Sequence, residues 1–162
     1  MLSQIKREYR RRMEEESLAR LVSCLERLSL EQIWFAPNEN CNSVGNLILH
    51  LEGNITQWIM SGLGNLPDHR SRPEEFVSNQ DLKKEELIER ITRTIHDSVT
   101  LVDSLDEADV MESRNVQVFE EDGISILIHV IEHTSYHTGQ VTLLTKMMLN
   151  LDTGYYKGLS LS

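Results

Sequence analysis

The sequence predicts an all-α protein, a four-helix bundle with long crossover connections. Four long stretches repeat their apolar residues at steps of three or four, which is the period of an amphipathic helix. The connections between them are polar, and the longer ones leave room for crossovers in place of simple up-down-up-down wiring. The four stretches are residues 3–28, 42–61, 82–105 and 125–149.

Chain length and net charge narrow the class of protein. The 162 residues are expected to form one domain, 1–162, whose apolar core folds without disulfides or a structural metal. A metal bound here would therefore serve function rather than folding. The net charge of -10 argues against binding to nucleic acid or to an anionic membrane, because both require a basic surface.

The sequence pattern predicts neither a secretory signal nor a membrane-spanning segment. Residues 1–10 are basic but contain no apolar signal-peptide core, and no stretch reaches the roughly 18 apolar residues of a transmembrane helix. Cys24 and Cys41 form neither a disulfide framework nor a redox motif. We therefore expect a cytoplasmic protein with two reduced thiols.

The first two helices have recognisable boundaries. The helix over 3–28 carries Arg, Lys and Glu on the face opposite its apolar residues. Residues 29–32 have the pattern of a capping box that opens a short helical turn. The second helix is expected to begin at an Asn42 or Ser43 cap and to end before Gly62.

The second half of the chain contains the other two helices and less regular segments. Proline and glycine make residues 63–80 a loop long enough to cross one end of a bundle. The third helix, 82–105, is expected to be closed by residues 106–109. Residues 115–119 alternate weakly and predict a short extended piece, such as one arm of a hairpin, before the fourth helix at 125–149.

The fourth helix contains two histidines that could bind one ion together. His133 and His137 are four residues apart, so they lie on one face of a helix. Such pairs also arise by chance on solvated faces, but here both belong to a stripe that faces the core, where imidazoles need hydrogen-bond partners or a metal. This stripe consists of Ile126, Val130, His133, His137, Val141, Leu144 and Met148.

The second helix has a polar row beside its apolar one. His50 lies at the border between the two rows. A histidine in such a place is more often structural than a metal ligand. His50 is nevertheless a candidate ligand, because it would complete a set of three histidines. Gly53 within this helix indicates close approach by another helix or a ligand. We predict that Asn46, Asn54 and Gln57, the other members of the polar row, line the mouth of a cavity.

A three-histidine site leaves coordination positions open, as catalytic metal sites do. Thr134 follows the first histidine of the pair where a zinc protease would carry its glutamate, so the HExxH motif is absent. Imidazole ligands suit zinc, nickel, iron and copper alike. We expect His129 to be a neighbouring or core histidine and Gln140 to support His137 by a hydrogen bond.

Two segments give the chain a resemblance to a known family. Residues 42–54, which contain a His-Leu pair, and residues 133–140, with HxxxH followed by Thr-Gly-Gln, resemble the DinB-like family of four-helix-bundle metalloproteins. The resemblance covers essentially the whole chain. It implies a divalent metal, zinc or nickel, held by His50, His133 and His137, and a homodimer.

The resemblance also implies several activities. Some members transfer a low-molecular-weight thiol, such as bacillithiol or mycothiol, onto small electrophiles, and others are described as metal-dependent hydrolases. We predict a thiol S-transferase, with a hydrolase or a non-enzymatic metal-binding stress-response module as alternatives. Many relatives carry Arg where this chain has Thr138, and neither Glu52 nor Glu132 has the spacing of a general base.

Overall fold

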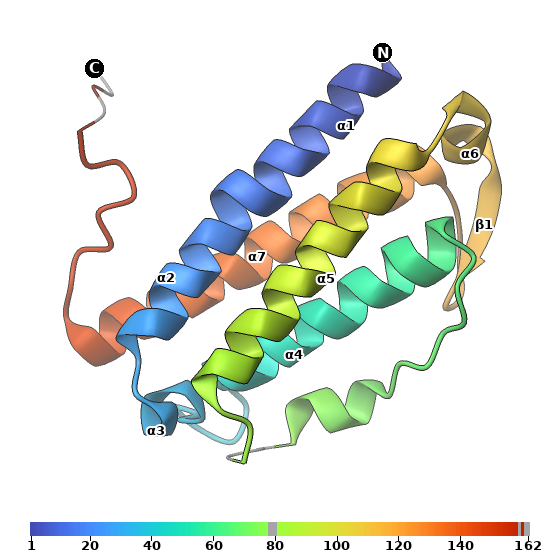
Figure 1. The fold of residues 1–162 in the computed structure, drawn as a ribbon. Helices are drawn as coiled ribbons and strands as arrows, with labels where there is room; N and C mark the ends of the chain where they lie inside the picture. The colour runs from blue at the N-terminus through green and yellow to red at the C-terminus, as the bar shows by residue number, and fades with distance from the viewer. Residues whose placement is uncertain (78–80, 159, 161–162) are drawn as a thin grey trace.

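Four long helical segments make up most of the structure, a computed structural model that describes residues 1–77, 81–158 and 160 (Figure 1). The first and second segments each change from α-helical to π-helical winding without a break in the helix. The four segments are α1 (Leu2–Arg10) with η1 (Arg11–Leu18) and α2 (Ala19–Arg27); α4 (Val44–Ile55) with η2 (Thr56–Leu63); α5 (Lys84–Ser104); and α7 (Gly123–Leu149).

The four segments pack around one apolar core. The first segment and the α4 segment each contact both α5 and α7. The apolar stripes predicted from the sequence face this core, where Tyr9, Leu51 and Ile91 are fully buried. The all-α class is therefore confirmed. Among the described helices, none has the combination of length and apolar character needed to cross a membrane.

Serine residues set the start of two helices. Ser29 forms the predicted capping box with Gln32 and opens α3 (Leu30–Ile33). Ser43, rather than Asn42, caps α4, because its hydroxyl accepts a hydrogen bond from the Asn46 backbone while the Asn46 side chain accepts one from the Ser43 backbone. The two backbone donors that these bonds satisfy would otherwise be unpaired at the helix start.

One prediction for the segment between α5 and α7 was wrong. Residues 106–109 do not close the third helix; Asp106 instead caps a separate short helix, α6 (Glu107–Met111), because its carboxylate accepts from the Asp109 backbone. The predicted hairpin is present, but its bounds differ from the extended piece predicted at 115–119. Its strands are β1 (Ser113–Val116) and β2 (Phe119–Asp122), which pair antiparallel with Val116 opposite Phe119.

The connection between the second and third segments is a crossover that runs back along the molecule. Because α4 and α5 point in the same direction, residues 64–83 must return the chain from the end of η2 to the start of α5 (Figure 1). This connection, which we call the crossover, contains the 3₁₀ helix η3 (Arg72–Phe76), and η3 packs against α4. Residues 78–80 of the predicted loop lie outside the described residues.

The side chain of one asparagine holds the crossover in place through two backbone carbonyls. The Asn46 amide donates to the backbone carbonyls of Glu75 and Val77, at 3.0 and 3.2 Å. Asn46 therefore serves both as part of the α4 cap and as an anchor for η3. The crossover brings a chain segment that is distant in sequence against the middle of α4.

Candidate metal centre

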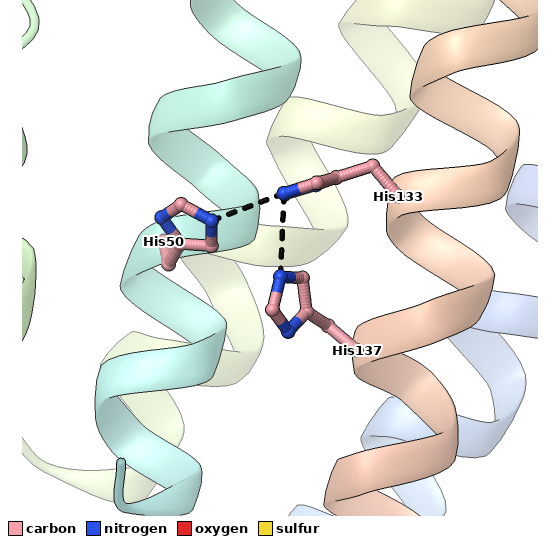
Figure 2. A group of neighbouring side chains, drawn as sticks. All are labelled: His50, His133 and His137. Carbon is pink, nitrogen blue, oxygen red and sulfur yellow. Dashed lines mark hydrogen bonds between the residues drawn. The ribbon is translucent and has the colours of Figure 1, made fainter. Parts of the chain in front are cut away.

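Three histidine side chains converge between α4 and α7. His50 comes from α4 and His133 and His137 from α7, and Figure 2 shows the three rings pointing toward one another. The Nε2 atom of His133 lies 3.1 Å from Nε2 of His50 and 3.2 Å from Nε2 of His137. One nitrogen of each ring lies within 4.8 Å of the others, so the three could hold one metal ion.

Helix geometry accounts for this convergence. His133 and His137 are one turn apart on α7, so their rings lie on one face and meet edge-on, with centroids 4.5 Å apart. α4 packs against this face, and the His50 ring centroid lies 4.9 Å from each of theirs. The predicted grouping of these three side chains is therefore observed.

Hydrogen bonds on the outer nitrogens direct lone pairs inward. His50 Nδ1 lies 2.8 Å from a Glu75 carboxylate oxygen, and because a carboxylate has no proton to give, the imidazole must donate. His137 Nδ1 likewise donates to the Gln140 amide oxygen at 2.7 Å. A neutral imidazole that carries its proton on Nδ1 has an unprotonated Nε2.

The donor set therefore fits a cation. The lone pairs of His50 and His137 both face Nε2 of His133, which can carry at most one proton to share between them. A metal ion would satisfy all three nitrogens at once. Nδ1 of His133 is buried and has no hydrogen-bond partner in the described part of the chain.

A buried ion pair from the crossover supports His50. Arg70 contacts both oxygens of Glu75, through Nε at 2.6 Å and Nη2 at 2.9 Å, and its Nη2 also lies 3.2 Å from His50 Nδ1. The side chains of Arg70 and Glu75 are only 4% and 8% exposed. This ion pair places a negative charge against the outer nitrogen of a candidate ligand, an arrangement that orients metal-binding histidines in proteins.

The glycine in α4 makes room for this pair. A Cβ atom added at Gly53 would lie 2.1 Å from a Glu75 carboxylate oxygen and 3.0 Å from Arg70 Nε. The close approach that this glycine predicted is therefore made by the crossover, through Arg70 and the short helix η3, and not by another of the long helices. Arg70 and Glu75 were missed in the sequence analysis, and the glycine was the one available signal that something packs there.

The other two members of the polar row, Asn54 and Gln57, differ in their contacts. Gln57 accepts hydrogen bonds from Arg70 Nη1 at 2.8 Å and from Gln117 at 2.5 Å, and it donates to Asp68 at 2.7 Å. Asn54 is buried, and its side-chain oxygen has no partner among the described residues. Gln57 thus ties the crossover and the hairpin to η2.

His129 and Thr138 lie outside the group of three. The His129 ring stacks on Trp58, with centroids 3.9 Å apart, and its centroid is 5.6 Å from that of His133. The Thr138 side chain is buried, and its hydroxyl has no partner in the described part of the protein. Thr138 therefore has no exposed group with which to contact an anion.

A cleft of about 400 Å³ lies on the other side of the Arg70–Glu75 pair. None of the three histidines lines it, although Glu75 both lines the cleft and contacts His50. Its walls come from α4, the crossover and α5. The polar and charged residues that line it are Glu52, Thr56, His69, Arg70, Ser71, Glu74, Glu75 and Arg90.

Burial keeps the candidate ligands neutral. Desolvation lowers the pKa of His133 to about 3, and the neighbouring histidines add to this effect. Desolvation also lowers the pKa of His50 and His137, partly opposed by the hydrogen bonds to Glu75 and Gln140. Neutral imidazole is the form that binds metal ions.

Comparisons with known proteins give the family of the chain and agree with its fold. A family profile described as "Protein of unknown function (DUF1572)" matches residues 4–162. The structure is similar to the crystal structure of a DinB-like protein from Bacillus cereus ATCC 10987, with a TM-score of 0.66 and 16% sequence identity. The similarity covers 85% of this chain and 88% of that one. No match was found among curated proteins.

We expect the metal-free protein to lose stability as the pH falls below 6.5, the ordinary pKa of histidine. Between pH 6.5 and about 3 the unfolded chain protonates at His133 while the folded chain does not, so the unfolded state binds more protons. The free energy of unfolding should therefore rise with pH across this range. Urea titrations in chelator would measure it, and His133→Gln should reduce the slope. Equal slopes in the two proteins would contradict this expectation.

Proposed function

Because the chain belongs to the DUF1572 family, a DinB-like family, we propose that it is a metal-dependent enzyme that binds one divalent ion, zinc or nickel, through His50, His133 and His137. The observation that carries this proposal is the convergence of three Nε2 atoms, with the outer nitrogens of two rings bonded to acceptors. A divalent metal, when bound, lowers the pKa of a coordinated water or thiol.

The surrounding residues prepare the site for the ion. Glu75 and Gln140 hold protons on the outer nitrogens of His50 and His137, which keeps the inner nitrogens free to coordinate. Burial keeps the imidazoles neutral at physiological pH. Three protein ligands leave further coordination positions for a small substrate, as in catalytic zinc sites.

The function that we propose for this site is transfer of a low-molecular-weight thiol onto a small electrophile. A hydrolase usually places a free carboxylate where it can take a proton from water. Among the described residues, Glu75 is the carboxylate bonded to one of the three histidines, His50, and its two oxygens are occupied by Arg70 and His50. A thiol whose pKa is already lowered needs no such base, which favours the transferase over the hydrolase.

We expect each of His50→Ala, His133→Ala and His137→Ala to lose most of the bound metal, because each removes one of three ligands. Elemental analysis of protein purified without a metal-affinity tag would measure the ratio of metal to chain. His129→Ala is the matched control and should keep the metal, since its ring lies outside the group. Full metal content in all three ligand variants would refute the site.

The replacement Glu75→Gln should weaken metal binding about 10- to 100-fold, because a neutral amide no longer fixes the proton of His50 or balances the charge of Arg70. Competition with a chromophoric chelator would measure the dissociation constant. Glu74→Gln, at the exposed neighbouring position, should leave affinity unchanged. If both variants bind metal as tightly as the natural protein, Glu75 does not support the site.

The transferase proposal predicts thiol-dependent turnover. Metal-loaded protein incubated with a model electrophile and a panel of low-molecular-weight thiols should consume thiol faster than the His133→Ala variant does. Parallel assays with model esters and amides test for hydrolysis. If the metal-loaded protein consumes thiol no faster than the variant, the transferase proposal is wrong. Cleavage of the esters or amides would then identify a hydrolase. No turnover in any of these assays would indicate a metal-binding module without enzymatic activity.

A further inference from the structure

The cleft beside the Arg70–Glu75 pair has the size of a small-molecule site. Its volume of about 400 Å³ lies within the range of roughly 300–1,000 Å³ that is common for pockets with small ligands. α4 contacts α5 and η3, and it runs between α5 and the crossover (Figure 1). The cleft therefore has an α5 side and a crossover side. No candidate metal ligand lines it, so it is a second site, separate from the metal centre.

The α5 side of the cleft presents a guanidinium group that is only partly used. Nε of Arg90 donates to both carboxylate oxygens of Glu52, at 3.2 and 2.9 Å. The two terminal nitrogens of Arg90 have no hydrogen-bond partner within the described ranges, and the side chain is 38% exposed. Two guanidinium nitrogens side by side can bind a carboxylate through two parallel hydrogen bonds. This side of the cleft is therefore suited to a carboxylate.

The crossover side presents a carboxylate that has no partner. Glu74 belongs to η3 and lines the cleft. Its side chain is exposed, and it makes no ion pair with another residue that the structure describes, whereas Glu75 beside it is bound to Arg70. An ionised carboxylate only accepts hydrogen bonds, so the group that complements it is a cation or another donor. An ammonium group provides both the charge and the donors.

The mixture of charges excludes several classes of ligand. The cleft is lined by carboxylates of Glu52, Glu74 and Glu75 and by guanidinium groups of Arg70 and Arg90. The carboxylates disfavour a phosphate or another multiply charged anion, and the guanidinium groups disfavour a metal ion or a diamine. A zwitterion suits both free groups at once, because its anion can bind Arg90 while its cation binds Glu74.

We propose that this cleft binds a free α-amino acid with an apolar side chain. Its carboxylate would bind the terminal nitrogens of Arg90 and its ammonium group would bind Glu74. Pro67 and Leu82 also line the cleft and offer apolar surface to the side chain. The end of a peptide chain carries only one of the two charges, so a free amino acid fits the cleft better than a peptide terminus does.

The proposal depends on the cleft alone. The Arg70–Glu75 pair lies between the cleft and His50, so an amino acid bound here is a ligand in addition to any molecule that reaches the metal. Binding can therefore be measured in metal-free protein, in the presence of a chelator. His133→Ala, which removes a candidate metal ligand that does not line the cleft, should bind the amino acid as the natural protein does. A failure of the metal centre would leave this result unchanged.

Isothermal titration calorimetry with L-leucine tests the proposal. N-acetyl-L-leucine, which lacks the ammonium group, and L-leucinamide, which lacks the carboxylate, should each bind about tenfold more weakly or less, because each loses one charged hydrogen-bonded contact. These two compounds also represent the two ends of a peptide. If L-leucine does not bind, the proposal is wrong. If either analogue binds as tightly as L-leucine, the cleft does not select a zwitterion.

Two variants assign each charge of the ligand to one side of the cleft. Glu74→Gln should raise the dissociation constant of L-leucine about tenfold but leave that of N-acetyl-L-leucine unchanged. Arg90→Gln should likewise weaken L-leucine but not L-leucinamide. Because Glu74 has no ion-pair partner among the described residues, its replacement should not disturb folding, which circular dichroism would verify.

Arg93→Gln is the matched control for Arg90→Gln. Arg93 is on the same helix and 60% exposed, but it does not line the cleft, so its replacement should leave the affinity for L-leucine unchanged. An equal loss of affinity in both arginine variants would show that L-leucine binds elsewhere. The same conclusion would follow if neither Glu74→Gln nor Arg90→Gln changed the affinity, and either result would overturn the proposal.

Discussion

The contact between α4 and α7 is the constraint on which the candidate site depends. It places imidazoles from two helices in an interior that buries mainly apolar side chains, and buried polar groups cost free energy unless they are hydrogen-bonded. Glu75 and Gln140 meet part of that requirement from outside, at the Nδ1 atoms of His50 and His137. The inner nitrogens have only one another, which is the arrangement that a cation resolves.

The crossover supplies what the helices alone do not. Since α4 and α5 point in the same direction, the chain must travel back along α4, and this path carries Arg70 and Glu75 to the histidines (Figure 1). A buried ion pair of this kind contributes little net stability, but removing one partner leaves an uncompensated charge. We therefore interpret the pair as a means of holding His50 in one protonation state and orientation rather than as a stabilising contact.

α7 has two chemically different faces. Its inner face contributes His133 and His137 to the site and fully buried residues such as Val130 to the core. Its outer face carries exposed apolar side chains, among them Tyr136 and Leu143. The Tyr136 ring meets the His137 ring edge-on, with centroids 5.0 Å apart, so an exposed aromatic side chain borders the candidate site.

Local patterns in the sequence were enough to predict the four helices, the Ser29 capping box and the His133–His137 pair, because helix period and capping depend on residues a few positions apart. His50 was added because it would complete a set of three and because the family resemblance implies it. Local reasoning also placed His133 and His137 on one face. It did not identify α6, because a capping aspartate directly after a helix resembles the end of that helix. Arg70 and Glu75 were also missed, since their partner lies 25 positions from Glu75 in the chain and no periodic signal links them. Which helices are neighbours, and how the crossover returns along α4, are decided by the packing of the whole core. Only that packing sets His50 within 3.1 Å of His133 and brings Glu75 behind it.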